Sequence, residues 1–143
     1  MTDKKPDLTR FKEAHERSFE SALTEIRGGR KRSHWMWYIF PQIRGLGMSA
    51  TSRYYAIRDL EEAAAFLDDA VLGSHLREIC RALLALETDN ATQVFGWPDD
   101  MKLRSSMTLF ALASDDDPLF RQVLDKFFGG RRDENTLRIL GRA

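Results

Sequence analysis

The sequence predicts an all-α fold, a compact single-domain orthogonal bundle of about six to eight helices. Apolar residues recur at three- and four-residue spacing along most of the chain, which is typical of helices with one buried face. Glycine pairs and capping residues divide this pattern into helix-length segments. With 143 residues, 43% of them hydrophobic and 31% charged, the chain can bury one core. We therefore expect a tail over residues 1–7 and one helical domain over residues 8–143.

The aromatic stretch Ser33–Gln42 is the least certain element, because it is apolar at nearly every position from Trp35 to Phe40. Spacing alone does not separate a buried helix from a short central strand here. The helical neighbourhood favours the helix. Pro41 lacks an amide hydrogen and disfavours a helical conformation at Phe40, so the element is expected to end or kink there.

The other elements follow from caps and apolar stripes. Ser49 and Asp59 are expected N-caps, and Pro98 is expected as the first residue of another helix. The glycine pairs Gly28–Gly29 and Gly129–Gly130 end two helices. In order, the expected helices and short turns span residues 8–26, 49–57, 60–67, 71–86, 90–95, 98–113, 119–128 and 133–140, with residues 115–118 as a loop and helix start.

The charge balance excludes several classes of function. Lys and Arg together number 22, as do Asp and Glu, so no net field attracts nucleic acid or an anionic membrane. One basic cluster, Arg27 with Arg30–Arg32, has no matching basic face elsewhere. Cys80 is the only cysteine, so no intramolecular disulfide can form, which fits a reducing cytoplasm.

Other sequence features exclude further classes of protein and of site. The first residues lack the apolar core of a signal peptide, and no apolar run is long enough to span a bilayer. Three scattered histidines and one cysteine do not have the spacing of a metal site. No nucleophile elbow or Walker phosphate loop is present. We expect a cytoplasmic monomer with no metal, no cofactor, and no nucleic-acid or membrane partner.

The aromatic stretch also offers polar groups for a ligand. If it is helical, His34 and Tyr38 lie on one face, with Gln42 just beyond the kink. Three hydrogen-bonding groups surrounded by Trp and Phe rings suit a planar polar ligand. The alternative is a core helix whose polar ends meet solvent, and aromatic runs at helical spacing usually belong to the core. Sequence alone leaves both interpretations open.

The segment Arg44–Ser49 has the composition of an anion site. Gly45 and Gly47 allow successive amides to converge, the start of a helix adds positive potential, and Arg44 adds a full charge. These features suit a phosphate or a carboxylate. The segment is not a dinucleotide fingerprint, because it lacks a third glycine and a preceding strand. The alternative is a connection between helices that needs a positive φ.

A third candidate is the helix face that carries Lys102, Ser105 and Ser106 at positions i, i+3 and i+4. A serine beside a lysine of lowered pKa can act as a nucleophile pair. We favour anion binding, because this spacing is common and unspecific. In the structural alternative the serines let a neighbouring helix approach while Lys102 extends along the surface. Asp133 is expected to cap the closing helix, or else to direct its carboxylate toward a ligand.

Several of these segments together resemble one known family, the domain-of-unknown-function 1810 family, over nearly the whole chain from Leu8. The resemblance implies a compact, mainly helical single domain found in bacteria and some eukaryotes, with no established activity and so no catalytic residue to transfer. Some members carry the label calpastatin, a disordered inhibitor, and the 43% hydrophobic content argues against that label. The motifs are Ser33–Gln42, Gly45-Leu-Gly47-x-Ser49, Tyr55-Ala-Ile57, Phe95-Gly96 with Asp99, Lys102-Leu103, Ser105–Phe110, and Asp133 with Thr136-Leu137.

A more distant similarity is to the NADAR family, helical N-glycosidases linked to NAD and ADP-ribose chemistry. Phe128–Leu137 is similar to that family's Trp-Gly-x-Gly-x-Asp-like turn before a Leu-rich last helix. Asp99–Leu103 is similar to an upstream Asp…Lys-Leu piece. The family's Glu-His pair has no clear counterpart, because His34 follows Ser33.

The leading hypothesis is a pocket for a small anionic, nucleotide- or ADP-ribose-like ligand, on which the positive side chains converge. If the site is catalytic, N-glycosidic hydrolysis is the favoured reaction, with Asp99, Asp133 or His34 as candidate catalytic residues. The alternative is a non-enzymatic protein-interaction module, in which Arg27–Arg32 meets an acidic partner. The expected ligand-binding residues are His34, Trp35, Trp37, Phe40, Gln42, Arg44, Gly45, Gly47, Ser49, Lys102, Ser105 and Ser106.

Overall fold

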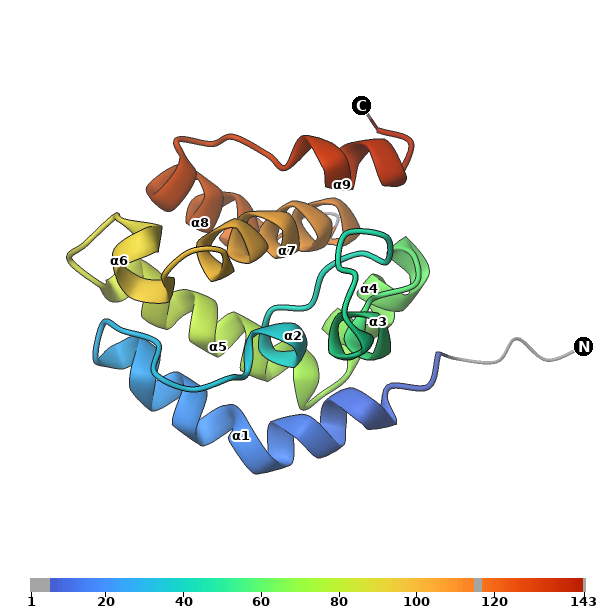
Figure 1. Cartoon of the computed structure of the whole chain (residues 1–143), viewed down its shortest axis with the longest axis horizontal. Coiled ribbons are helices and arrows are strands. Elements are labelled where there is room, and N and C mark those ends of the chain that lie inside the picture. Colours follow the sequence, from blue (N-terminus) through green and yellow to red (C-terminus); the bar gives the residue numbers. More distant parts are fainter. Residues whose placement is uncertain (1–5, 115–116, 143) are drawn as a thin grey trace, which may run out of the picture.

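Nine helices fold around one apolar core in the computed structural model, which describes residues 6–114 and 117–142. Those ranges contain no strand, and the prediction of an all-α fold is confirmed. The expected tail and the loop before the eighth helix fall partly outside the described residues, at 1–5 and 115–116. The helices are α1 (Thr9–Arg27), α2 (Met36–Ile39), α3 (Ala50–Tyr55), α4 (Leu60–Asp68), α5 (Leu72–Ala85), α6 (Ala91–Phe95), α7 (Asp99–Ala113), α8 (Leu119–Phe128) and α9 (Glu134–Ile139) (Figure 1).

Side-chain caps begin four of these helices. Ser49, Asp59, Asn90 and Asp133 each accept a hydrogen bond from the backbone amide three positions later. Such a cap stabilises a helix by about 1 kcal/mol, because it satisfies an amide without a helical partner. Pro98 differs from the expectation by one position, since it precedes α7 as the N-cap residue and is not the first helical residue.

The aromatic stretch is helical over a single turn. α2 spans Met36–Ile39, and Phe40 leaves the helix with φ −124° and ψ 70° just before Pro41. The expected end at the proline is thus confirmed, because the residue before a proline avoids the α region. His34 lies outside α2 and shares no helix face with Tyr38. Its carbonyl oxygen lies 3.3 Å from the Tyr38 hydroxyl.

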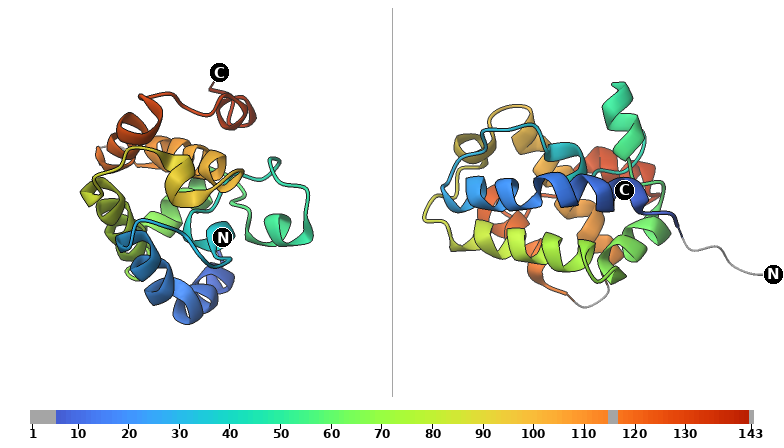
Figure 2. Two further views of the ribbon diagram at one scale, coloured as in Figure 1. Left: turned by 60° about the vertical axis from the view of Figure 1, so that its left-hand side comes forward. Right: turned by 90° about the horizontal axis from the view of Figure 1, so that it is seen from below.

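The core lies between α1 and α9, which occupy opposite sides of the molecule (Figures 1 and 2). α1 packs against α5, α7 packs against α4 and α8, and α9 packs on α7. Burial of one large apolar side chain stabilises a fold by about 1.5–3 kcal/mol. Among the described residues, no helix has both the length and the apolarity to cross a bilayer. The largest buried side chains include Trp35, Phe11, Phe40, Phe66, Phe110 and Phe120.

Residues 28–35, between α1 and α2, form a segment that we call the clamped loop. Glu25 accepts hydrogen bonds from the backbone amides of Arg32 and Ser33, at 2.7 and 2.9 Å. It also accepts them from the Ser33 hydroxyl at 2.6 Å and from the Trp35 indole Nε1 at 2.9 Å. Burial alone would raise the pKa of Glu25, but these hydrogen bonds outweigh it and lower the pKa to about 2. One charged carboxylate therefore fixes the loop and the Trp35 ring.

Residues 44–56, which include α3, form an excursion that we call the flap. Its ends meet in a single parallel bridge between Ile43 and Ile57. There the Arg44 amide donates to the Ile57 carbonyl, and the Ile57 amide donates to the Gln42 carbonyl, both at 2.8 Å. α3 contributes no buried residue, and Figure 2 shows it projecting from the other helices. The flap is therefore attached to the core at its base and packs against it through the partly buried side chains of Leu46 and Tyr55.

Candidate functional site

A cavity of about 30 Å³ lies between the flap and Trp37, at the double-glycine bend. Its lining comes from α2, from the bridge at the base of the flap, and from the flap itself. Five of the expected ligand residues meet there: Trp37, Gln42, Arg44, Gly45 and Gly47. The lining also includes Ile43, Ser52, Arg53, Tyr55 and Ala56.

The shape of the bend depends on its two glycines. Gly45 has φ +106°, and a Cβ there would lie 3.3 Å from Cδ1 of Ile139 on α9. At Gly47 a Cβ would lie 2.4 Å from Cβ of Ser52, far closer than two carbons approach in a folded protein. The positive φ expected of this segment is therefore present at Gly45, and no larger side chain fits at Gly47 without moving α3.

The cavity lining carries positive charge without a carboxylate. Arg44 and Arg53 both line it and are both exposed to solvent. The amides of Gly45 and Gly47 donate to no other described residue, whereas the Arg44 amide belongs to the bridge. α3 adds little potential, because it spans only six residues and Ser49 already caps it.

A second cluster of charged side chains lies beside the rings of Trp35 and Trp37. Lys102 Nζ lies 3.1 Å from Asp99 Oδ1 and 5.4 Å from the centroid of the Trp37 ring. Lys31 Nζ lies 2.9 Å from Asp99 Oδ2 and 5.1 Å from the Trp35 ring. Ammonium groups at these distances are attracted to an indole face. Lys102 thus contacts a ring that lines the cavity but does not line the cavity itself.

Several other expected ligand residues lie in the core. Trp35 and Phe40 are fully buried, and the Trp35 indole nitrogen is taken by Glu25. Ser105 and Ser106 are buried within α7, where the Ser105 hydroxyl donates to the Met101 carbonyl. None of these four side chains lines the cavity. At Trp35 and Phe40, the interpretation of the aromatic stretch as part of the core agrees with the structure.

The remaining candidates are also placed elsewhere. Ser49 acts as the cap of α3. His34 is exposed and does not line the cavity. Asp133 caps α9, accepting from the Thr136 amide at 2.9 Å and from the Thr136 hydroxyl at 2.6 Å. Of the side chains expected to converge on one cavity, Arg44 lines it, Lys102 contacts the Trp37 ring without lining it, and His34 lies elsewhere.

Arg53 and Tyr55 are the important lining residues that the ligand hypothesis omitted. Both belong to the flap, and they reach the cavity because the bridge brings residues 43 and 57 together. One signal was available, since Tyr55-Ala-Ile57 is among the motifs of the family resemblance. No sequence pattern pointed to Arg53, because no local spacing or motif indicates that it lies near Arg44 in the fold.

His15 and His75 form a hydrogen-bonded pair that joins α1 to α5. Their Nδ1 atoms lie 3.0 Å apart, and their rings are parallel within 1°. His15 Nε2 lies 2.8 Å from the Tyr38 carbonyl, which can only accept, so His15 Nδ1 is the acceptor for His75. Burial lowers the pKa of His15 to about 4. Within residues 6–114 and 117–142, no group of three or more His, Cys, Asp or Glu side chains can hold a metal.

The basic cluster of the interaction-module hypothesis is divided between interior and surface. The Lys31 side chain is buried against Asp99. Arg27 pairs with Glu78 of α5 at 3.4 Å. Arg30 and Arg32 remain exposed. The exposed part of the cluster is therefore smaller than the sequence suggests.

Comparison with known proteins gives the family. A family model described as a protein of unknown function, DUF1810, matches residues 5–140. The crystal structure of the conserved hypothetical protein Rv1873 from Mycobacterium tuberculosis is similar, with 44% identity and a TM-score of 0.92, over 94% of this chain and 96% of that chain. No curated protein matches. Neither match concerns the NADAR family, and that similarity stays a prediction. The family model matches far more than half of the chain, including the flap, the bridge and every residue of the cavity, and the chain therefore belongs to the DUF1810 family.

Proposed function

We propose that this protein binds a small ligand through an oxyanion, a phosphate or carboxylate group, held between the flap and Trp37. The composition of the cavity lining supports this proposal. Arg44 and Arg53 face one cavity, and no carboxylate is among its lining residues. The amides of Gly45 and Gly47 have no partner among the described residues. Guanidinium groups and unpaired backbone amides are the donors that bind oxyanions in proteins.

The cavity volume limits what can enter. About 30 Å³ is close to the share of liquid volume that one water molecule occupies. Pockets that enclose a drug-sized ligand measure roughly 300–1,000 Å³. With the flap in this position, the cavity has room for about one oxygen atom of an anionic group, and the rest of the group lies at its mouth. A nucleotide- or ADP-ribose-like ligand would place one phosphate at the bend and keep its sugar and base outside the cavity.

The proposal is binding and not catalysis. Hydrolysis of an N-glycosidic bond needs a group that stabilises developing positive charge or positions water beside the scissile bond. Asp99 is paired with both Lys31 and Lys102. Asp133 caps α9. Neither carboxylate lines the cavity, so neither supports a catalytic step at this site.

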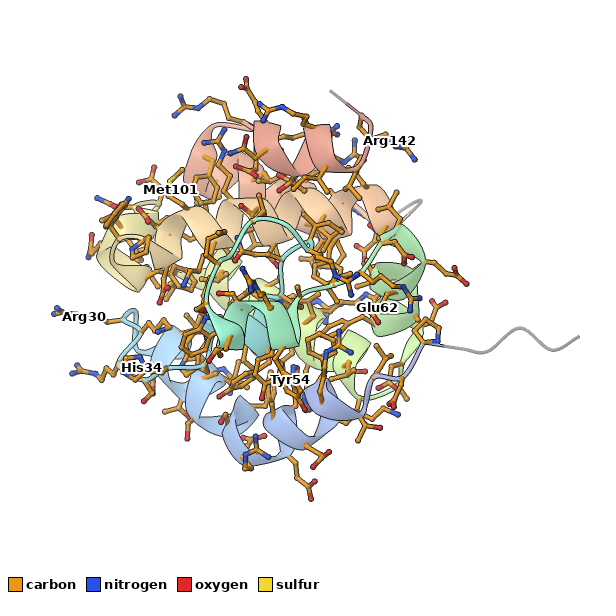
Figure 3. All side chains as sticks on the ribbon, turned by 45° about the vertical axis from the view of Figure 1, so that its right-hand side comes forward. Arg30, His34, Tyr54, Glu62, Met101 and Arg142 are labelled. Carbon is orange, nitrogen blue, oxygen red and sulfur yellow. The ribbon has the colours of Figure 1, made fainter. Side chains whose placement is uncertain are left out.

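Calorimetric titration with inorganic phosphate at low chloride concentration tests the proposal. We expect binding by the wild-type protein with a Kd on the order of 1 mM, which corresponds to about 4 kcal/mol. Arg44→Ala and Arg53→Ala are each expected to weaken binding by roughly tenfold or more, because each removes a charge-assisted hydrogen bond. Arg30→Ala is the matched control, since Arg30 is exposed in the clamped loop beyond the end of α1 and does not line the cavity (Figure 3).

The outcomes separate the parts of the proposal. If the wild-type protein binds no phosphate, the proposed function is wrong. If Arg44→Ala retains full affinity with folding intact, the role of Arg44 is wrong. A thermal-shift comparison of phosphate, ADP-ribose, NAD and nucleotide phosphates then identifies the larger ligand, because a ligand that binds only the native state raises its melting temperature.

A further inference from the structure

We infer that the flap is a hinged cover of the anion cavity and that Arg10 of α1 is the latch that holds it closed. This inference deepens the proposed function, on which its meaning for ligand entry rests. The geometry of the latch itself stands independently. Arg10 does not line the cavity, so it is a positioning residue and not a ligand residue.

The first observation is how few contacts hold the flap. α3 has no buried residue, and Tyr54 is 60% exposed and Met48 77% exposed. Tyr55 is the side chain of α3 that packs inward, with its ring centroid 5.1 Å from Tyr38 and 6.1 Å from Phe11. Segments with little buried apolar surface open locally at a small fraction of the global unfolding free energy. The flap is therefore the part of the site most able to move.

The second observation is the set of bonds made by one guanidinium. Arg10 Nε donates to the Tyr54 carbonyl at 2.8 Å, and Arg10 Nη2 donates to the Ala56 carbonyl at 2.9 Å. Both carbonyls lie at the end of α3, where Tyr55 and Ala56 line the cavity. Arg10 therefore fixes the limb of the flap that leads from α3 back to the bridge.

The third observation is that Arg10 is itself held in place from the core. Its Nη2 lies 3.0 Å from Oε1 of Glu62, whose side chain is 5% exposed. Glu62 Oε1 also accepts from the Arg58 amide at 2.9 Å. Figure 3 labels Tyr54 on the flap and Glu62 on α4, the two elements that Arg10 joins. A planar guanidinium can serve all these acceptors at once, whereas an ammonium group cannot reproduce the fork.

The flap thus has two attachments, the bridge that joins its ends and the hydrogen bonds from Arg10 to the limb that leads from α3 back to the bridge. The bridge between Ile43 and Ile57, next to Gly45 with its φ of +106°, is the pivot. Release of Arg10 from Tyr54 and Ala56 frees this limb, on which Tyr55 and Ala56 line the cavity. A ligand larger than the closed cavity of about 30 Å³ then enters by displacing the flap. Lids of this kind open and close around ligands in many binding sites.

Amide hydrogen exchange in the Arg10→Lys variant tests the latch without any ligand. Lysine keeps the charge beside Glu62 but loses the fork. We expect exchange at the amides of α3 to accelerate about tenfold, while the bridge amides of Arg44 and Ile57 and the helices α5 and α7 exchange at the wild-type rate. Arg27→Lys is the matched control, because Arg27 is also an α1 arginine paired with a glutamate of another helix. It is expected to leave the flap unchanged.

Glu62→Gln provides a second variant, since it keeps an acceptor near Arg10 but removes the charge; it is expected to accelerate flap exchange to a smaller extent. Unchanged flap exchange in both variants, or equal acceleration in every helix, overturns the latch. Phosphate binding is measured on the same proteins, and Arg10→Lys is expected to release phosphate faster. Selective flap acceleration in a protein that binds no phosphate supports the latch and overturns only the proposed function.

Discussion

The clamped loop and the flap both leave the helical core, and each is anchored by one side chain of α1. Glu25 clamps residues 28–35 near the end of α1, and Arg10 holds residues 44–56 near its beginning. The clamped loop delivers Trp35 into the core with 1% of its surface exposed, whereas α3 of the flap buries no residue. A carboxylate that accepts hydrogen bonds therefore stabilises the loop, and a guanidinium that donates them holds the geometry of the flap.

The largest difference between the two regions should appear when an aromatic ring is removed from each. Trp35→Ala is expected to lower the free energy of unfolding by about 3–5 kcal/mol, because it leaves a cavity in the core. Tyr54→Ala, on the exposed flap, is expected to change it by less than about 0.5 kcal/mol. Urea denaturation measures both values. Equal losses in the two variants would contradict the division between a structural loop and a detachable flap.

The next effect is that of the clamp itself. Glu25→Gln is expected to cost about 1–3 kcal/mol of stability, because the amide replaces one acceptor oxygen with a donor that faces donors. Glu20→Gln is the matched control, since Glu20 is an exposed residue of the same helix. Denaturation midpoints measure the change, and hydrogen exchange within the flap should stay at the wild-type rate.

The pH dependence of stability distinguishes the clamp from other acid-sensitive groups. The pKa of Glu25 is lowered from 4.5 to about 2, so its contribution is complete above about pH 4.5 and is lost as the pH falls toward 2. The pKa of His15 is lowered from 6.5 to about 4. Because the folded state resists protonation of this buried ring, the free energy of unfolding falls as the pH falls from about 6.5 to about 4. Glu25→Gln should reduce the loss of stability in the lower window, to which Asp59, Asp69 and Asp117 also contribute through their lowered pKa values, and keep the upper one. Loss of both windows together would contradict the assignment.

A smaller effect is expected from a change confined to the flap. Gly47→Ala should weaken phosphate binding by about tenfold, or about 1.4 kcal/mol, because the new Cβ displaces α3 from the bend. The melting temperature should barely change, since no core side chain moves. The double variant Gly47→Ala with Ser52→Gly removes the clashing Cβ and should recover most of the affinity, with Ser52→Gly alone as the reference. Failure of this rescue would mean that the bend does not set the affinity.

Much of the fold could be predicted because its signals are local. A capping side chain acts on an amide three positions away, so Ser49, Asp59 and Asp133 marked helix starts correctly. A proline restricts the residue before it, so the end of the aromatic helix at Phe40 was also predictable. The glycine bend at Gly45 could be recognised from composition alone, because few other residues adopt its φ.

The parts that could not be predicted depend on contacts between distant residues. Trp35 and Trp37 lie two positions apart with similar surroundings in the sequence, yet one ring is bound by Glu25 in the core and the other lines the cavity. Which ring faces which way is decided by the clamped loop. The flap is closed by a bridge between residues 43 and 57, and its latch comes from Arg10 on another helix. No local pattern encodes these pairings.

The three tryptophans allow the most direct test of the anion site. In an NMR titration with phosphate at constant ionic strength, the account predicts saturable shifts for the Trp37 indole and for the amides of Gly45 and Gly47. It predicts no shift for the Trp35 indole, which is bound to Glu25, or for Trp97, which is 78% exposed and lies outside the cavity lining. Equal shifts at all three indoles, or none at the bend, would contradict an oxyanion site between the flap and Trp37.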